Sequence, residues 1–165
     1  MADLLVVRPT VGPERDAVRS LLADAVGRGP HGERALELLD RADAGPGAEY
    51  LAYVVAQQGL FGGERVVGAL VAERVAGAAG TIRVHALAGR GTGTHDAAAV
   101  RERLVAALAE RARREGGRLL VAELPDEPAL RPMRDALLAA GFAEEGRVAD
   151  LVRDGVALLL LRRDL

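Results

Sequence analysis

This sequence of 165 residues contains no cysteine and no lysine, and each absence narrows what the protein can do. Without cysteine there are no disulfides, thiolate metal sites or cysteine nucleophiles. Without lysine, arginine provides every permanently basic side chain. The net charge of -2 lacks the basic surplus of a nucleic-acid-binding protein, so we expect neither nucleic acid nor a membrane as a partner.

Long apolar runs and targeting signals are also missing. No stretch approaches the roughly 20 apolar residues that a transmembrane helix needs. Residues 1–8 lack the basic start and long apolar centre of a secretory signal, so we expect a cytoplasmic protein. The three histidines, His31, His85 and His95, lie far apart without metal-ligand spacing, and we expect no metal site.

The size and composition predict one domain over residues 1–165, since 50% of the residues are hydrophobic and 28% charged. Periodicity and turn signals predict strand 4–8, helices 14–26 and 31–42, strands 50–57, 64–75 and 81–88, helix 95–114, strand 118–124, helix 128–140, and strands 142–148 and 156–163. This order indicates an α/β (α+β) fold, a mixed and mostly antiparallel sheet of about seven strands with one β-α-β crossover and helices on both faces. The apolar run 156–161 predicts a last strand covered on both faces.

The crossover at the centre of the chain joins strand 81–88, a glycine-rich turn at 89–94, the helix from 95 and strand 118–124. The N–H groups of a helix's first turn have no partners inside the helix, and the helix dipole favours anions there. This unit therefore predicts a seat for a phosphate-bearing cofactor. The alternative is a plain crossover whose glycines only let the chain turn.

Three strings in the C-terminal half carry a family resemblance. They are the strand and its end at 118–125 (RLLVAELP), the helix end at 136–142 (ALLAAGF), and the connection at 148–156 (VADLVRDGV). Together with the element order, they resemble the GNAT family of N-acetyltransferases over nearly the whole chain.

The resemblance implies acetyl-CoA as co-substrate, in a V-shaped opening between the fourth and fifth strands. Its pantetheine arm would pair with the backbone of Leu87, Ala88 and Gly89. Its pyrophosphate would bind the N–H groups that open the central helix, in a motif Q/R-x-x-G-x-G/A. An amine would attack the thioester directly, a carboxylate or histidine would take its proton, and a tyrosine on the last helix would protonate the leaving thiolate.

The pyrophosphate motif fits this chain in two registers. Family spacing counted back from Glu123 places it at 96–101, where Ala99 and Arg101 replace both glycines. Alanine removes room for close backbone approach, and Arg101 would either obstruct the phosphates or bind them.

The second register, 90–95, keeps Arg90 first and Gly93 fourth, with Gly91 between them. It makes the helix about six residues longer than usual, nearly two turns. Spacing favours the first register and hence a degenerate cofactor loop.

Other positions also depart from the family pattern. The usual tyrosine on the last helix is Leu137, the tyrosine of the later connection is Val152, and the chain has no asparagine for the cofactor contact after the fifth strand. Besides an N-acetyltransferase, these departures leave open a non-catalytic GNAT-like binding or assembly protein and a GNAT-fold enzyme with altered chemistry.

Three side chains are candidate catalytic bases beside the expected opening. His85 would deprotonate an amine near neutral pH, or is instead hydrogen-bonded within the sheet. Glu123, at the end of the fifth strand, would be a base or would hold an ammonium group, and Glu73, late in the third strand, is the third candidate. For each carboxylate the alternative is a solvated charge at a strand end.

The leading hypothesis is transfer of acetyl from acetyl-CoA to a small-molecule amine. Tyr53 is expected to pack in the core, with a place in the lining of the acceptor pocket as the alternative. Arg111 is expected to lie on a solvated helix face with the arginines that follow it. Family members are often dimers, and the apolar last strand is compatible with a homodimer.

Overall fold

The computed structural model describes residues 4–27, 29–59 and 63–165, so part of the glycine-containing turn expected between strands 50–57 and 64–75 lies outside the described residues. Within them, one seven-stranded sheet has the order β1-β2-β3-β4-β5-β7-β6, parallel only between β4 and β5. The elements are β1 (Leu4–Pro9), α1 (Arg15–Val26), α2 (Pro30–Arg41), β2 (Tyr50–Gln58), β3 (Glu64–Arg74), β4 (Thr81–Gly89), α3 (Ala97–Arg114), β5 (Leu119–Pro125), α4 (Arg131–Ala139), β6 (Ala143–Arg153) and β7 (Val156–Asp164), with 3-10 turns η1 (Gly12–Glu14) and η2 (Pro128–Leu130). The predicted order and fold class are confirmed.

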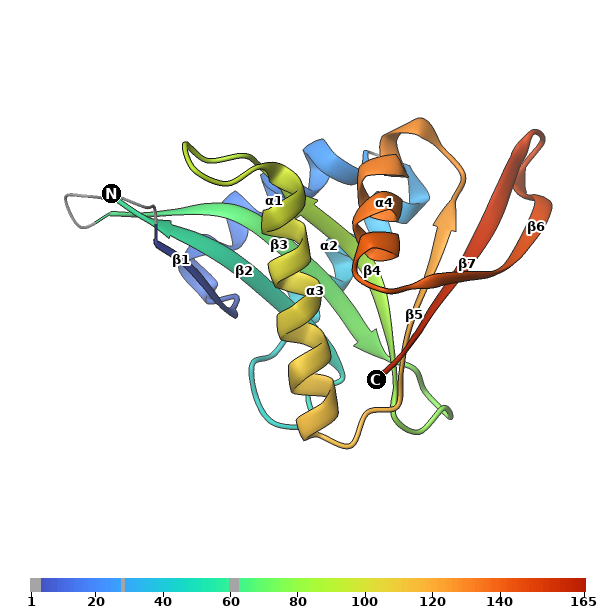
Figure 1. Cartoon of the computed structure of the whole chain (residues 1–165), viewed down its shortest axis with the longest axis horizontal. Coiled ribbons are helices and arrows are strands. Elements are labelled where there is room, and N and C mark those ends of the chain that lie inside the picture. Colours follow the sequence, from blue (N-terminus) through green and yellow to red (C-terminus); the bar gives the residue numbers. More distant parts are fainter. Residues whose placement is uncertain (1–3, 28, 60–62) are drawn as a thin grey trace.

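Helices cover both faces of the sheet, as predicted (Figure 1). α3 and α4 lie on one face, where Leu104, Leu108 and Leu137 pack against the strands. α1 and α2 lie on the other, with Val18 and Leu38 fully buried. Among the described residues, no helix has the length and apolar character needed to cross a membrane.

The central helix begins two residues later than predicted, at Ala97 and not at His95. Asp96 is its N-cap, and the Asp96 carboxylate accepts a hydrogen bond of 2.7 Å from the Ala99 amide. Before it, the Thr92 amide donates to the His95 carbonyl at 2.7 Å, which closes a turn that keeps His95 out of the helix.

The end of the chain differs from prediction in three ways. The helix predicted at 128–140 is a 3-10 turn followed by the shorter α4. β6 extends to Arg153, which pairs with Val156 after an irregular stretch that follows Val148, and Gly155 in the turn has a φ of 77°. β7 is not covered on both faces: Ala157, Leu159 and Leu161 are buried, whereas the residues between them are only half-buried. α1 and α2 pack on β2, β3 and β4 and so leave the second face of β7 open.

Arg111 does not lie on a solvated face, which corrects the prediction. Only 9% of the residue is exposed, and its guanidinium donates to the Tyr53 hydroxyl at 3.0 Å, the Gly45 carbonyl at 2.6 Å and the Glu115 carboxylate at 2.9 Å. Tyr53 is buried in the core, as expected. A hollow of about 440 Å³ lies against these two side chains, and none of its lining residues belongs to β4 or β5.

Candidate functional site

Strands β4 and β5 pair over only three residues and then separate. The pairs are Thr81 with Leu119, Ile82 with Leu120 and Arg83 with Val121. Beyond them β4 stays paired with β3 and β5 with β7, so each strand keeps its outer neighbour while the two diverge (Figure 1). The predicted divergence is confirmed, but it begins directly after Arg83 and not near Leu87. Leu87, Ala88 and Gly89 therefore lie in the part of β4 that does not pair with β5.

His85 lies in a β-bulge at the start of this split. Val71 of β3 pairs with Ala86 and Ala72 pairs with Val84, which leaves His85 as an extra residue in β4. A bulge bends its strand and increases the local twist. This bend, two residues after the last pair, gives a physical reason for β4 to turn away from β5.

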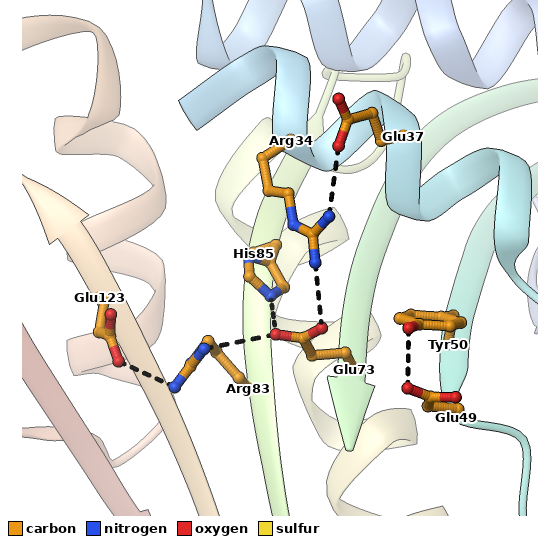
Figure 2. Close-up of polar contacts among 8 residues, drawn as sticks. All are labelled: Arg34, Glu37, Glu49, Tyr50, Glu73, Arg83, His85 and Glu123. Atoms are coloured by element: carbon orange, nitrogen blue, oxygen red, sulfur yellow. Dashed lines mark hydrogen bonds and ion pairs between the residues drawn. The ribbon is translucent and has the colours of Figure 1, made fainter. Parts of the chain in front are cut away.

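The structure brings His85 and Glu73 together. The His85 Nε2 atom lies 2.8 Å from the Glu73 Oε1 atom, and the side chains are only 13% and 14% exposed (Figure 2). Because a carboxylate can only accept a hydrogen bond, we assign the ring proton to Nε2. The lone pair of the neutral ring is then on Nδ1, the atom available as a base.

Two arginines complete a chain of contacts that ends at Glu123 (Figure 2). The Arg83 guanidinium lies 3.4 Å from Glu73 Oε1 and 3.1 Å from Glu123 Oε1. On the other side, Arg34 of α2 lies 3.7 Å from Glu73 Oε2. All three predicted catalytic candidates thus belong to one polar cluster, and Arg83 bridges β4 and β5 at the narrow end of the split.

Burial keeps the histidines of this region uncharged at neutral pH. Burial lowers the pKa of His85 below its ordinary value of 6.5, and the hydrogen bond that His85 donates to Glu73 opposes that shift without cancelling it. Burial also lowers the pKa of His31, the second residue of α2. The His31 Nε2 atom is buried and has no hydrogen-bond partner among the described residues.

Glu123 borders an open, mainly apolar hollow of about 340 Å³ on the face that α1 and α2 leave uncovered. Val121 and Leu160 line its floor, and Arg83 and Arg162 are among its charged neighbours.

The start of α3 is the predicted pyrophosphate seat, and it holds a carboxylate. Asp96 occupies the first position of the favoured register and caps the helix at Ala99. The helix start at Ala97 agrees with that register, since the alternative, 90–95, lies wholly in the preceding loop. The Asp96 carboxylate places a negative charge at the positive end of the helix dipole, which would otherwise favour a bound anion.

Gly89 and Arg101 close the space between β4 and α3. A side chain at Gly89 would overlap the Ala97 carbonyl, with only 2.7 Å between its Cβ and that oxygen, so the two backbones are already in contact. The Arg101 guanidinium lies 3.4 Å from the Gly89 carbonyl, and burial lowers its pKa. Its Nε atom is buried without a hydrogen-bond partner among the described residues.

Of the other loop candidates, Gly91 lies beside the helix start, since a Cβ there would be 3.9 Å from the Ala97 amide nitrogen, whereas Arg90 is directed elsewhere. Arg90 forms an ion pair of 2.6 Å with Asp24 of α1. Gly91 and Gly93 are exposed in the loop between β4 and α3. Leu137, at the family's tyrosine position, is fully buried and provides no acid. Among the described residues, no group of three or more potential ligands is arranged to hold a metal ion.

The strand order, the single parallel pair and the split define the class: the chain has the GNAT fold, which confirms the resemblance in the sequence. No model of a protein family matches the chain, and no curated protein matches it. The chain does match solved structures. A protein assigned to the GNAT acetyltransferases from Desulfovibrio desulfuricans superposes with a TM-score of 0.78 at 21% identity, over 98% of this chain and 99% of that one.

Two further structures are aminoglycoside 6'-N-acetyltransferases. The enzyme from Enterococcus faecium has a TM-score of 0.73 at 14% identity, over 96% of each chain. Another, complexed with coenzyme A, has a TM-score of 0.70 at 12% identity, also over 96% of each chain. At these identities the comparison establishes the fold, and function must be argued from the site.

Sequence reasoning missed three side chains of the site: Arg34, Arg83 and His31. Arg83 lies two residues before His85, and alternation along a strand was a usable signal that both lie near one face. Arg34 and His31 come from α2, and no signal in the sequence places that helix over the end of β3.

Proposed function

We propose that this protein is an N-acyltransferase that transfers acetyl from acetyl-CoA to the amine of a small molecule by direct attack. The observation that carries the proposal is the split between β4 and β5 with a buried histidine–carboxylate pair at its narrow end. The name of the aminoglycoside acetyltransferase complexed with coenzyme A supports the same donor for a protein of this fold.

The pantetheine arm of the donor fits this chain better than its pyrophosphate does. Beyond Arg83, the β4 backbone does not pair with β5, which suits an extended arm with amide groups. The start of α3 suits a pyrophosphate poorly, because Asp96 already caps the helix there. Acetyl-CoA would supply the activated acyl thioester.

The polar cluster supplies the remaining chemistry. Nδ1 of His85 accepts the proton that the amine releases, while Glu73 holds the ring through Nε2 and stabilises its charged form. Arg34 and Arg83 hold Glu73 in place. Glu123, at the rim of the apolar hollow, is positioned to attract an ammonium group.

A non-catalytic binding protein is the second candidate, and the Asp96 cap is the observation that favours it. A protein that has lost its pyrophosphate contacts can keep the fold for another purpose. This candidate predicts no transfer to any amine, whereas the first predicts transfer that depends on His85.

The test is release of free CoA thiol from acetyl-CoA with a panel of small primary amines. The chain has no cysteine, so it contributes no thiol background. General-base catalysis contributes about 10²–10⁴ in rate, so His85→Gln should lower kcat by that order. Glu37→Gln is the matched control, since Glu37 lies 3.2 Å from Arg34 and forms no hydrogen bond or ion pair with His85. No amine-dependent release, or full activity in His85→Gln, would refute the proposal.

A further inference from the structure

The start of α3 has an electrostatic character opposite to that of an anion site. The exposed Asp96 carboxylate binds the Ala99 amide at 2.7 Å, and the Asp96 carbonyl accepts from the Val100 amide at 3.3 Å. Amides that would face a pyrophosphate are therefore partly occupied by the chain's own acceptor. A pyrophosphate placed there would also lie beside a like charge, which is unfavourable.

The space between the end of β4 and the first turn of α3 is also narrow. A Cβ at Gly89 would lie only 2.7 Å from the Ala97 carbonyl oxygen, so the two backbones lie close together there. The Arg101 guanidinium lies 3.4 Å from the Gly89 carbonyl, and burial lowers its pKa while the nearby Asp96 and Asp135 oppose that shift. In this position the guanidinium is directed to the chain's own backbone, and the variant Arg101→Met below tests whether it also holds a pyrophosphate.

We propose that the acyl donor is recognised by its pantetheine arm and not by its nucleotide. The substrate class of the site is then pantetheine thioesters in general, of which acetyl-CoA is one member. This inference rests on the proposed function, because it concerns the donor of that reaction. Its basis is a contrast between two parts of the site: beyond Arg83 the edge of β4 that faces β5 is unpaired and can take up an arm, whereas the carboxylate at the start of α3 repels a pyrophosphate.

The first experiment compares acetyl-CoA with S-acetylpantetheine, which carries the same arm and thioester without any phosphate. The inference predicts KM values within about threefold of each other at ~0.1 M salt, where screening acts over about 10 Å. Raising the salt should lower the KM for acetyl-CoA or leave it unchanged, because a repulsion is being screened. A KM for acetyl-CoA at least tenfold below that of S-acetylpantetheine, or one that rises steeply with salt, would overturn the inference.

The second experiment removes the charge and keeps the cap. Asparagine caps helices about as well as aspartate, so Asp96→Asn should fold normally. It should lower the KM for acetyl-CoA by about fivefold, as expected for one charge at a helix end, and leave that for S-acetylpantetheine unchanged. Glu110→Gln, an exposed carboxylate in the last turns of the same helix, is the matched control and should change neither value.

Arg101→Met tests the remaining alternative, that Arg101 holds the pyrophosphate. If it does, this variant raises the KM for acetyl-CoA but not that for S-acetylpantetheine, and the inference fails. The inference predicts that the ratio of the two KM values is unchanged. The same variants can be compared by calorimetric binding of CoA and pantetheine, which decides the inference even if no amine is acetylated. Absence of turnover with both donors would instead count against the proposed function.

Discussion

Replacing Glu73 by glutamine tests the role of the cluster in detail. The change keeps a carbonyl oxygen that can accept from His85 Nε2 but removes the negative charge 2.8 Å from the ring. When His85 takes a proton, the wild-type carboxylate stabilises the resulting imidazolium, and the amide does so much less. The effect is therefore larger in the transition state than in the resting enzyme.

The size of the effect follows from the geometry. Hydrogen bonds to charged groups contribute about 1.5–3 kcal/mol, and this pair is only 13% and 14% exposed, so solvent screens it weakly. Since ~1.4 kcal/mol is a factor of ten in rate, Glu73→Gln should lower kcat by about tenfold to a hundredfold. Glu73 opposes the burial-induced lowering of the His85 pKa, so removing it should lower that pKa further.

The assay is the pH profile of kcat/KM for amine acetylation. The acidic limb, where protonation of His85 stops the reaction, should move to lower pH in Glu73→Gln, while the plateau rate falls. Glu37→Gln should reproduce the wild-type profile. An acidic limb that moves to higher pH, or an unchanged plateau rate, would refute the assignment of His85 as the base oriented by Glu73.

Three further predictions concern stability. Arg111→Ala should lower the free energy of unfolding by about 3 kcal/mol in urea titrations, because it leaves the buried Tyr53 hydroxyl without its partner, whereas the exposed Arg113→Ala should leave it unchanged. Gly32→Ala should lower the free energy of unfolding by about 3 kcal/mol, since its Cβ would overlap the backbone carbonyl of Gly27, which would have to shift; an unfolding midpoint equal to that of the wild type would contradict this. The pKa values of His31 and His85 are lowered on folding, so the unfolded chain binds more protons than the folded protein at mildly acidic pH. The thermal midpoint should therefore fall as the pH drops below 6.5, and a midpoint that does not change with pH would contradict these pKa shifts.

Most of the fold could be predicted because its signals are local. The helices and strands follow apolar periodicity, and glycine and proline mark the turns between them. Arg111 shows that residue type alone does not predict burial. It lies three positions after Leu108 and seven after Leu104, on the helix face that packs on the sheet, so periodicity placed it inward while its charge suggested solvent.

The site could be predicted only in part, because its geometry depends on pairing between distant residues. The bulge at His85 exists only relative to the register of β3, which the sequence of β4 does not contain. The bridge from Arg83 to Glu123 joins residues 40 positions apart, and it depends on the three-residue pairing of β4 with β5. Asp96 is the first residue of the motif placed at 96–101, yet its role as N-cap depends on where the helix begins.

Hydrogen exchange of the β4 backbone tests the central claim most directly, namely that the split between β4 and β5 receives the arm of an acyl donor. With saturating acetyl-CoA and no amine, the account predicts slower exchange at amides of residues 84–89, and little change in β2 as the internal reference. Protection of the hollow beside Tyr53 and Arg111, with residues 84–89 unchanged, would contradict it.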